Sequence, residues 1–161
     1  MKQSKKLLSL SLAAAMTMGL AAPAMAAEET VKPEEGKIVI LHTNDVHCQI
    51  DQAKGEDGAV TNLGYAGVAA YKAEMEAQYG AENVTLVDAG DAIQGGPIGT
   101  LSKGSYIVDI MNQVGYDLAI PGNHEFDYGM ENFLTLAKDK AEYSYLCCNF
   151  TDLNGKAVLD A

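Results

Sequence analysis

The chain has 161 residues, with 22 acidic residues against 11 basic ones and a formal net charge of −11 at pH 7. Every basic residue is a lysine, so no guanidinium group is present to bind phosphate through paired hydrogen bonds. An acidic chain without clustered positive charge argues against a nucleic-acid-binding surface. We therefore expect no nucleic acid among the partners.

The N-terminus has the pattern of a secretory signal peptide. Lys2, Lys5 and Lys6 precede an apolar run over residues 7–20, and Ala24-Met25-Ala26 follows. A membrane anchor is the alternative, but the run is short for a bilayer span and rich in Ala, Ser and Thr. We predict that residues 1–26 are a signal peptide and that the protein is exported to the periplasm, the cell surface or the extracellular space. After cleavage we expect no stable membrane anchor.

Residues 27–37 are acidic, contain proline and lack periodicity, so we predict a mobile leader. From residue 38, apolar strands alternate with amphipathic helices, which predicts an α/β fold with a largely parallel sheet. The expected strands are 38–42, 84–87, 118–121 and 145–150. The first is apolar on both faces and is expected to lie centrally. Helices are predicted over 65–79, ending at Gly80, and 105–114, ending at Gly115, and a third apolar stripe begins at Met130.

Polar residues follow three of these strands. Asp45 and His47 come after the first strand, Asp91 after the second, and Asn123 and His124 after the third. Ligands of open α/β sheets collect beyond the carboxyl ends of the strands, so these side chains are expected to converge. Aspartate, histidine and asparagine together suit zinc, manganese or iron. The alternative for the last group is an ordinary helix start capped by asparagine.

Several other residues have plainer interpretations. Asp88 is expected to be a hydrogen-bonding scaffold residue, and His42 is expected to be packed in its strand. The glycine-rich residues 95–99 lack the Gly-Lys-Ser/Thr end of a P-loop and are predicted to form a flexible link. Asn154-Gly155 predicts a hairpin turn.

Three cysteines form an odd set for an exported protein: Cys48, Cys147 and Cys148. We interpret them as small buried packing residues. A bridge from Cys48 to one of the other two, or a metal-ligating Cys48 thiolate next to His47, is the alternative.

Three segments in the same order resemble successive motifs of the 5'-nucleotidase branch of the calcineurin-like metallophosphoesterases. They are residues 41–47 (LHTNDVH), 88–91 (DAGD) and 122–129 (GNHEFDYG). The resemblance implies that residues 38–161 are the N-terminal half of a four-layer α/β/β/α sandwich. That family is much longer and carries further metal-binding histidines and a nucleoside-binding domain, so we interpret the chain as an N-terminal fragment.

The resemblance also implies a site with two divalent metal ions, zinc, manganese or similar. Asp45 and His47 would hold the first ion, Asp91 would bridge the two, and Asn123 would bind the second. A metal-bound hydroxide would then attack the phosphorus atom of the substrate.

His124 would be the catalytic histidine, with Asp127 as its partner, and Asn123 and His124 would contact the substrate phosphate. The implied substrate is a nucleotide or a nucleotide sugar. The competing hypothesis is a truncated, non-catalytic fragment that binds metal. The reading frame beyond codon 161 distinguishes the two hypotheses.

Overall fold

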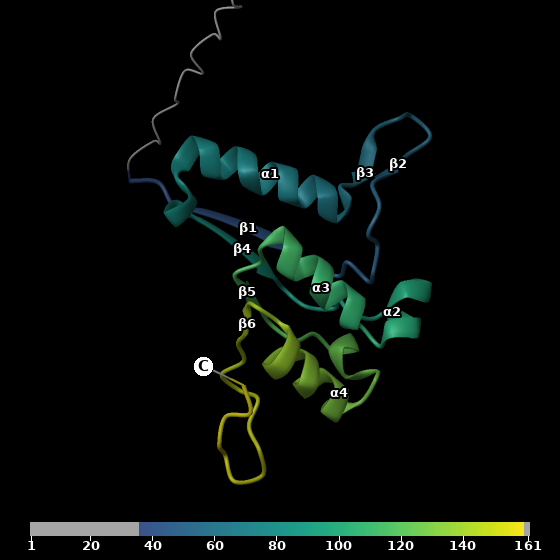
Figure 1. Ribbon diagram of the computed structural model, residues 1–161, viewed down its shortest axis with the longest axis vertical. Helices are drawn as coiled ribbons and strands as arrows, with labels where there is room; N and C mark the ends of the chain where they lie inside the picture. Colours follow the sequence, from purple (N-terminus) through teal and green to yellow (C-terminus); the bar gives the residue numbers. More distant parts are fainter. Residues whose placement is uncertain (1–35, 160–161) are drawn as a thin grey trace, which may run out of the picture. The chain divides into compact units, whose positions relative to one another are not determined.

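The computed structural model describes residues 36–159. The predicted signal peptide and most of the predicted leader lie outside these residues. A parallel sheet of four strands in the order β1-β4-β5-β6 forms the framework (Figure 1). Its strands are β1 (Val39–Thr43), β4 (Val84–Asp88), β5 (Leu118–Ala119) and β6 (Ser144–Tyr145).

The helices lie between successive strands of this sheet. They are α1 (Gly64–Tyr79), α3 (Ser105–Val114) and α4 (Met130–Thr135), which continues as a π-helical turn (Leu136–Lys140). Both predicted helix ends are confirmed: Gly80 and Gly115 have φ of 88° and 80°, a left-handed backbone that glycine adopts at little cost. The parallel strands and intervening helices confirm the predicted α/β class.

Shorter elements complete the described chain. A small antiparallel pair, β2 (Ala53–Lys54) and β3 (Val60–Asn62), lies between β1 and α1. One short 3₁₀ turn (Ala81–Asn83) precedes β4, and another (His124–Phe126) follows β5. Residues 95–99 were predicted to be a flexible link, and this was wrong, because helix α2 (Gly96–Ser102) begins there. Pro97 suits the first turn of that helix, where an N–H group has no helical partner.

The hydrophobic core lies between the sheet and the helices. Leu86 of β4, Ile107 and Met111 of α3 and Phe133 of α4 are fully or almost fully buried. Phe133 makes edge-to-face contact with the ring of Tyr145 on β6, at 5.2 Å between ring centroids. These contacts hold the three βα units to one another, so the strand ends that carry the polar loops have fixed relative positions.

The other face of the sheet has no helix against it in the described part of the chain. Ile38 is 79% exposed, Ile40 is 68% exposed, and His42 is exposed on the same strand. Within the described residues, strand β1 is at the edge of the sheet and pairs only with β4, whereas β4 has a neighbour on each side. The expectations that β1 lies centrally and that His42 is packed were therefore wrong. Apolar residues on both faces of a strand do not specify its place in the strand order.

The C-terminal region also departs from expectation. Strand β6 has two residues rather than six, and only Cys48 of the three cysteines is buried; Cys147 is half-buried and Cys148 is exposed. All three are free thiols. The predicted turn at Asn154-Gly155 is confirmed by an antiparallel bridge between Thr151 and Ala157.

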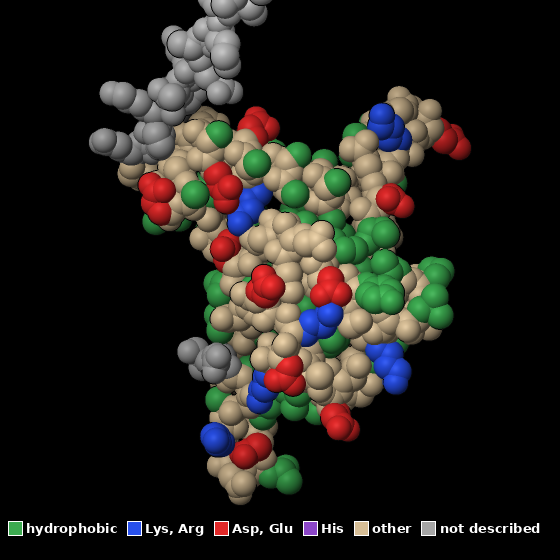
Figure 2. All heavy atoms as spheres, in the orientation of Figure 1, with side chains coloured by type: hydrophobic (Ala, Val, Ile, Leu, Met, Phe, Trp, Pro, Cys, Tyr) green, Lys and Arg blue, Asp and Glu red, His purple; other side chains and the backbone are tan. Residues whose placement is uncertain are grey.

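Acidic side chains are distributed over the helix-bearing face rather than gathered in one patch (Figure 2). Such a distribution favours solubility. Among residues 36–159, none of the helices combines the length and apolar character needed to cross a bilayer.

Candidate metal centre

Two loops that follow β1 and β4 extend the pairing of these strands beyond their ends. The backbone N–H groups of Asp45, His47 and Cys48 donate to the carbonyl oxygens of residues 90, 91 and 92, at 2.9, 3.0 and 3.1 Å. Because three backbone hydrogen bonds join the loops, the backbone of Asp45 and His47 is held next to that of Asp91. This confirms that the first two motifs meet at the carboxyl edge of the sheet.

The same loops contain an unusual concentration of left-handed backbone. Asp45, His47, Cys48 and Asp91 have φ between 47° and 61°, and they are four of the five non-glycine residues with positive φ in the described chain. Each such conformation costs about 1–3 kcal/mol and persists only where surrounding contacts enforce it. Strained backbone of this kind is concentrated at functional sites.

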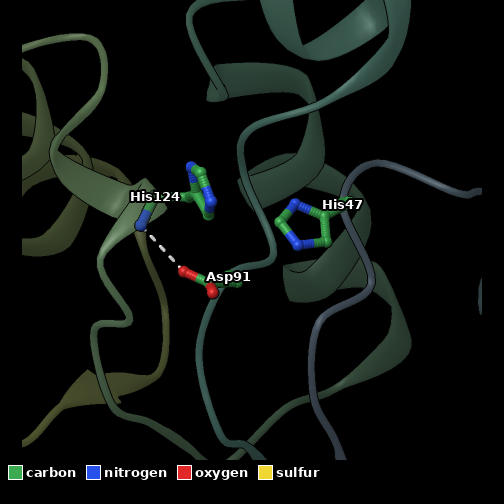
Figure 3. A group of neighbouring side chains, drawn as sticks. All are labelled: His47, Asp91 and His124. Carbon is green, nitrogen blue, oxygen red and sulfur yellow. Dashed lines mark hydrogen bonds between the residues drawn. The ribbon is translucent and has the colours of Figure 1, made fainter.

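Three side chains from the three motifs come together at this edge. Ligand atoms of His47, Asp91 and His124 all lie within 4.8 Å of one another (Figure 3). The rings of His47 and His124 meet edge to face, with centroids 5.1 Å apart. Nδ1 of His47 lies 3.1 Å from the carbonyl oxygen of Gln94, and Nδ1 of His124 lies 2.8 Å from Oδ2 of Asp127.

These contacts leave Nε2 of each ring available to a metal ion. Oxygen partners of this kind orient metal-binding histidines and fix their tautomers. Two imidazoles and a carboxylate are suitable ligands for zinc or manganese. The residues that the structure brings together therefore fit a divalent metal ion.

Asp45 and Asn123 are the remaining predicted metal ligands. Asp45 is exposed, and its Oδ2 accepts a hydrogen bond of 2.8 Å from the side chain of Asn44. Asn123 is exposed at the start of the 3₁₀ turn that contains His124. The structure groups His124 with His47 and Asp91, although the sequence suggested a catalytic role for His124. The division of these residues into metal ligands and catalytic groups remains a prediction.

Asp127 favours the protonated form of His124. The hydrogen bond from His124 to this carboxylate raises the pKa of the imidazole above its ordinary value. We expect Asp127→Asn to lower that pKa, because an amide stabilises an imidazolium less than a carboxylate does. Titration of the His124 ring protons by NMR in the presence of a chelator measures this directly. An unchanged pKa in the variant would contradict the pairing.

Asp88 is a buried scaffold residue, as predicted. Its Oδ1 accepts a hydrogen bond of 2.8 Å from the hydroxyl of Thr43, and its Oδ2 accepts one of 3.0 Å from the N–H of Gly90. Burial raises the pKa of Asp88 to about 7, although these two hydrogen bonds oppose the shift. The residue thus joins the ends of β1 and β4 directly beneath the loop that carries Asp91.

The role of Glu125 is not apparent from the sequence. Its side chain is fully buried and accepts hydrogen bonds from backbone N–H groups of both neighbouring loops. The only signal in the sequence was its position next to His124 within the third motif. Its burial shows that it has a structural role, because a charged side chain is rarely buried without hydrogen-bond partners.

A parallel α/β sheet with histidine and aspartate ligands at its carboxyl edge defines a candidate metal-dependent hydrolase. Residues 38–159 match the Calcineurin-like phosphoesterase family, and the chain belongs to this family. This confirms the resemblance that the three motifs suggested.

Relatives and solved structures agree with this assignment. The chain is 37% identical over 115 residues to a snake venom 5'-nucleotidase of Gloydius brevicauda and 36% identical over 116 residues to 5'-nucleotidase of Homo sapiens. Each alignment covers 70% of this chain and 20% of the relative, so the chain spans about one fifth of these proteins.

Two solved structures share the fold. The calcineurin-like phosphoesterase YfkN from Bacillus subtilis has a TM-score of 0.62 and 26% identity, covering 76% of this chain and 40% of that one. A 5'-nucleotidase precursor from Thermus thermophilus has a TM-score of 0.60 and 27% identity, covering 69% and 22% of the two chains.

Proposed function

We propose that the full-length protein containing this chain is an exported phosphoesterase that hydrolyses nucleotide phosphate esters with two divalent metal ions. The observation that carries the proposal is the group formed by His47, Asp91 and His124, within residues that match the family. The relatives named 5'-nucleotidases support a nucleotide as the substrate. A nucleotide sugar is the second candidate substrate.

Four residues are proposed as metal ligands: Asp45 and His47 for the first ion, Asp91 as the bridge, and Asn123 for the second. Bound divalent ions would neutralise phosphate charge and lower the pKa of a coordinated water toward neutrality. This charge neutralisation matters here because the chain has no arginine and carries twice as many acidic as basic residues.

His124 and Asp127 are proposed to manage the proton. Nε2 of His124 donates a proton to the departing ester oxygen or a hydrogen bond to a phosphate oxygen. Asp127 accepts the hydrogen bond from Nδ1, so it orients the ring and keeps Nε2 directed into the site. The side-chain amide of Asn123 donates a hydrogen bond to the phosphate.

Activity assays test this function. We expect the full-length protein to hydrolyse AMP, UDP-glucose or an aryl phosphate with manganese or zinc added, and a chelator to abolish turnover. The 161-residue chain alone is expected to bind at most one ion tightly, since it supplies only four proposed ligand positions, and to show negligible turnover. Equal turnover by the two proteins would contradict this reading of the site. Absence of turnover by the full-length protein would favour the non-catalytic, metal-binding alternative.

Export has a separate test. We expect the protein recovered from outside the cytoplasm to begin at Ala27, because Ala24-Met25-Ala26 provides small residues before the cleavage point. N-terminal sequencing measures this. An exported pool that retains Met1 would contradict the predicted signal peptide.

A further inference from the structure

The Glu125 side chain lies between the loop that carries Asp91 and the loop that carries His124. Its Oε1 accepts hydrogen bonds from the N–H groups of Ala92 and Ile93, at 2.8 and 3.4 Å. Its Oε2 accepts hydrogen bonds from the N–H groups of Asp91 and Gly122, at 2.8 and 2.6 Å. One fully buried carboxylate thus binds three consecutive amides of one loop and an amide of the other.

A second contact connects the same loops in the opposite direction. Oδ1 of Asp91 accepts a hydrogen bond of 2.8 Å from the backbone N–H of His124, drawn as the dashed line in Figure 3. Each loop therefore supplies a carboxylate that accepts from the backbone of the other. The position of the Asp91 carboxylate relative to His124 depends on this reciprocal pairing.

The two loops also approach each other more closely than side chains would permit. A Cβ atom on Gly122 would lie 2.3 Å from Oδ1 of Asp91, and a Cβ on Gly90 would lie 2.6 Å from the nitrogen of Gly122. Real Cβ atoms do not tolerate such distances. The loops are therefore in direct backbone contact, and a small displacement of one must move the other.

We propose that Glu125 is a positioning residue that sets the Asp91 carboxylate against His47 and His124 and thereby determines metal affinity. The proposal rests on the proposed function in so far as Asp91 is a metal ligand there. Glu125 can hold this loop because of the left-handed backbone of Asp91, with φ of 61°. The N–H groups of Asp91 and of the next two residues all donate to the same carboxylate. Charge-assisted hydrogen bonds are stronger than neutral ones, and buried N–H groups left without them are costly.

Glu125→Gln tests this with little change of shape. The NH₂ group of glutamine must face either the amides of Ala92 and Ile93 or those of Asp91 and Gly122, so one pair of N–H groups loses its acceptor. Glu74→Gln is the matched control, because Glu74 is exposed on α1 and distant in sequence from all three motifs.

In the full-length protein, we expect Glu125→Gln to weaken Mn²⁺ binding about 10–100-fold by calorimetry, the usual effect of removing a group that supports a metal ligand. Hydrogen exchange of the metal-free protein should be faster at the amides of Asp91, Ala92 and Gly122. For turnover, kcat is expected to fall while KM changes little. The Glu74→Gln variant should match the unsubstituted protein in every measurement.

A folded Glu125→Gln protein with unchanged Mn²⁺ affinity would overturn the proposal, even with a lowered melting temperature, because that result indicates a structural role only. If Glu125→Gln does not fold, Glu125→Asp provides the test: it keeps the charge but shortens the reach, and unchanged Mn²⁺ affinity would again overturn the proposal. If the unsubstituted protein binds Mn²⁺ without nucleotide turnover, the proposed function fails, whereas weaker binding by Glu125→Gln still supports positioning. An unsubstituted protein that binds no Mn²⁺ would overturn the positioning proposal.

Discussion

Asp91→Asn is expected to reduce both the metal content and the turnover of the full-length protein. Asp91 lies at the centre of the site, with a carboxylate oxygen within 4.8 Å of ligand nitrogens from both His47 and His124. Asparagine preserves the size of the side chain and an oxygen that can accept from the N–H of His124. It removes the negative charge, which would otherwise attract both metal ions if Asp91 bridges them as proposed.

The expected loss of Mn²⁺ affinity exceeds the roughly 10–100-fold that removal of a supporting residue costs, because Asp91 is itself a proposed ligand. Elemental analysis after dialysis measures the metal content, and kcat at saturating AMP measures the turnover. Asp139→Asn is a suitable control, since Asp139 is exposed in the π-helical turn that follows α4. An Asp91→Asn protein with full metal content would contradict the bridging role.

His124→Ala is expected to separate metal binding from catalysis. If His124 transfers a proton to the leaving group, its loss should lower turnover by about 10²–10⁴, the usual contribution of a positioned acid or base, and leave the metal ions bound. The structure makes the outcome informative, because a ring nitrogen of His124 lies within 4.8 Å of ligand atoms of His47 and Asp91, so His124 is also placed to bind metal.

Metal content and kcat of the His124→Ala protein should be compared with those of the Asp139→Asn control. Asp139 is exposed in the π-helical turn that follows α4, so its replacement should change neither quantity. Loss of metal from the His124 variant would assign this residue to the ligands instead. Unchanged turnover would remove it from the reaction altogether.

The expected effect of Asp127→Asn on the pKa of His124 depends on the contact between these two residues. His124 and Asp127 are three positions apart, and the 3₁₀ turn between them is enough to bring Nδ1 and Oδ2 to 2.8 Å. This contact could be predicted from the sequence because it is local. The grouping of His124 with His47 and Asp91 could be expected only in outline, from the rule that strand ends share one edge.

Features that depend on neighbours along the chain were predictable from the amino-acid pattern alone. The apolar spacing over 105–114 and the following Gly115 predicted α3 with its observed ends, since helix periodicity and a left-handed terminal glycine are local properties. The three motifs likewise identified the family, and the order of strands and helices indicated the α/β class.

Features that depend on distant parts of the chain became visible only in the folded protein. β1 is an edge strand in the described residues because it pairs only with β4, whose other side pairs with β5, and its apolar sequence could not encode this order. The burial of Glu125 could not be predicted from the sequence, because three of its four hydrogen-bond donors, the amides of residues 91–93, lie 32 to 34 positions away along the chain. A charged side chain can leave water only where enough donors meet it, and the folded backbone alone brings those donors together.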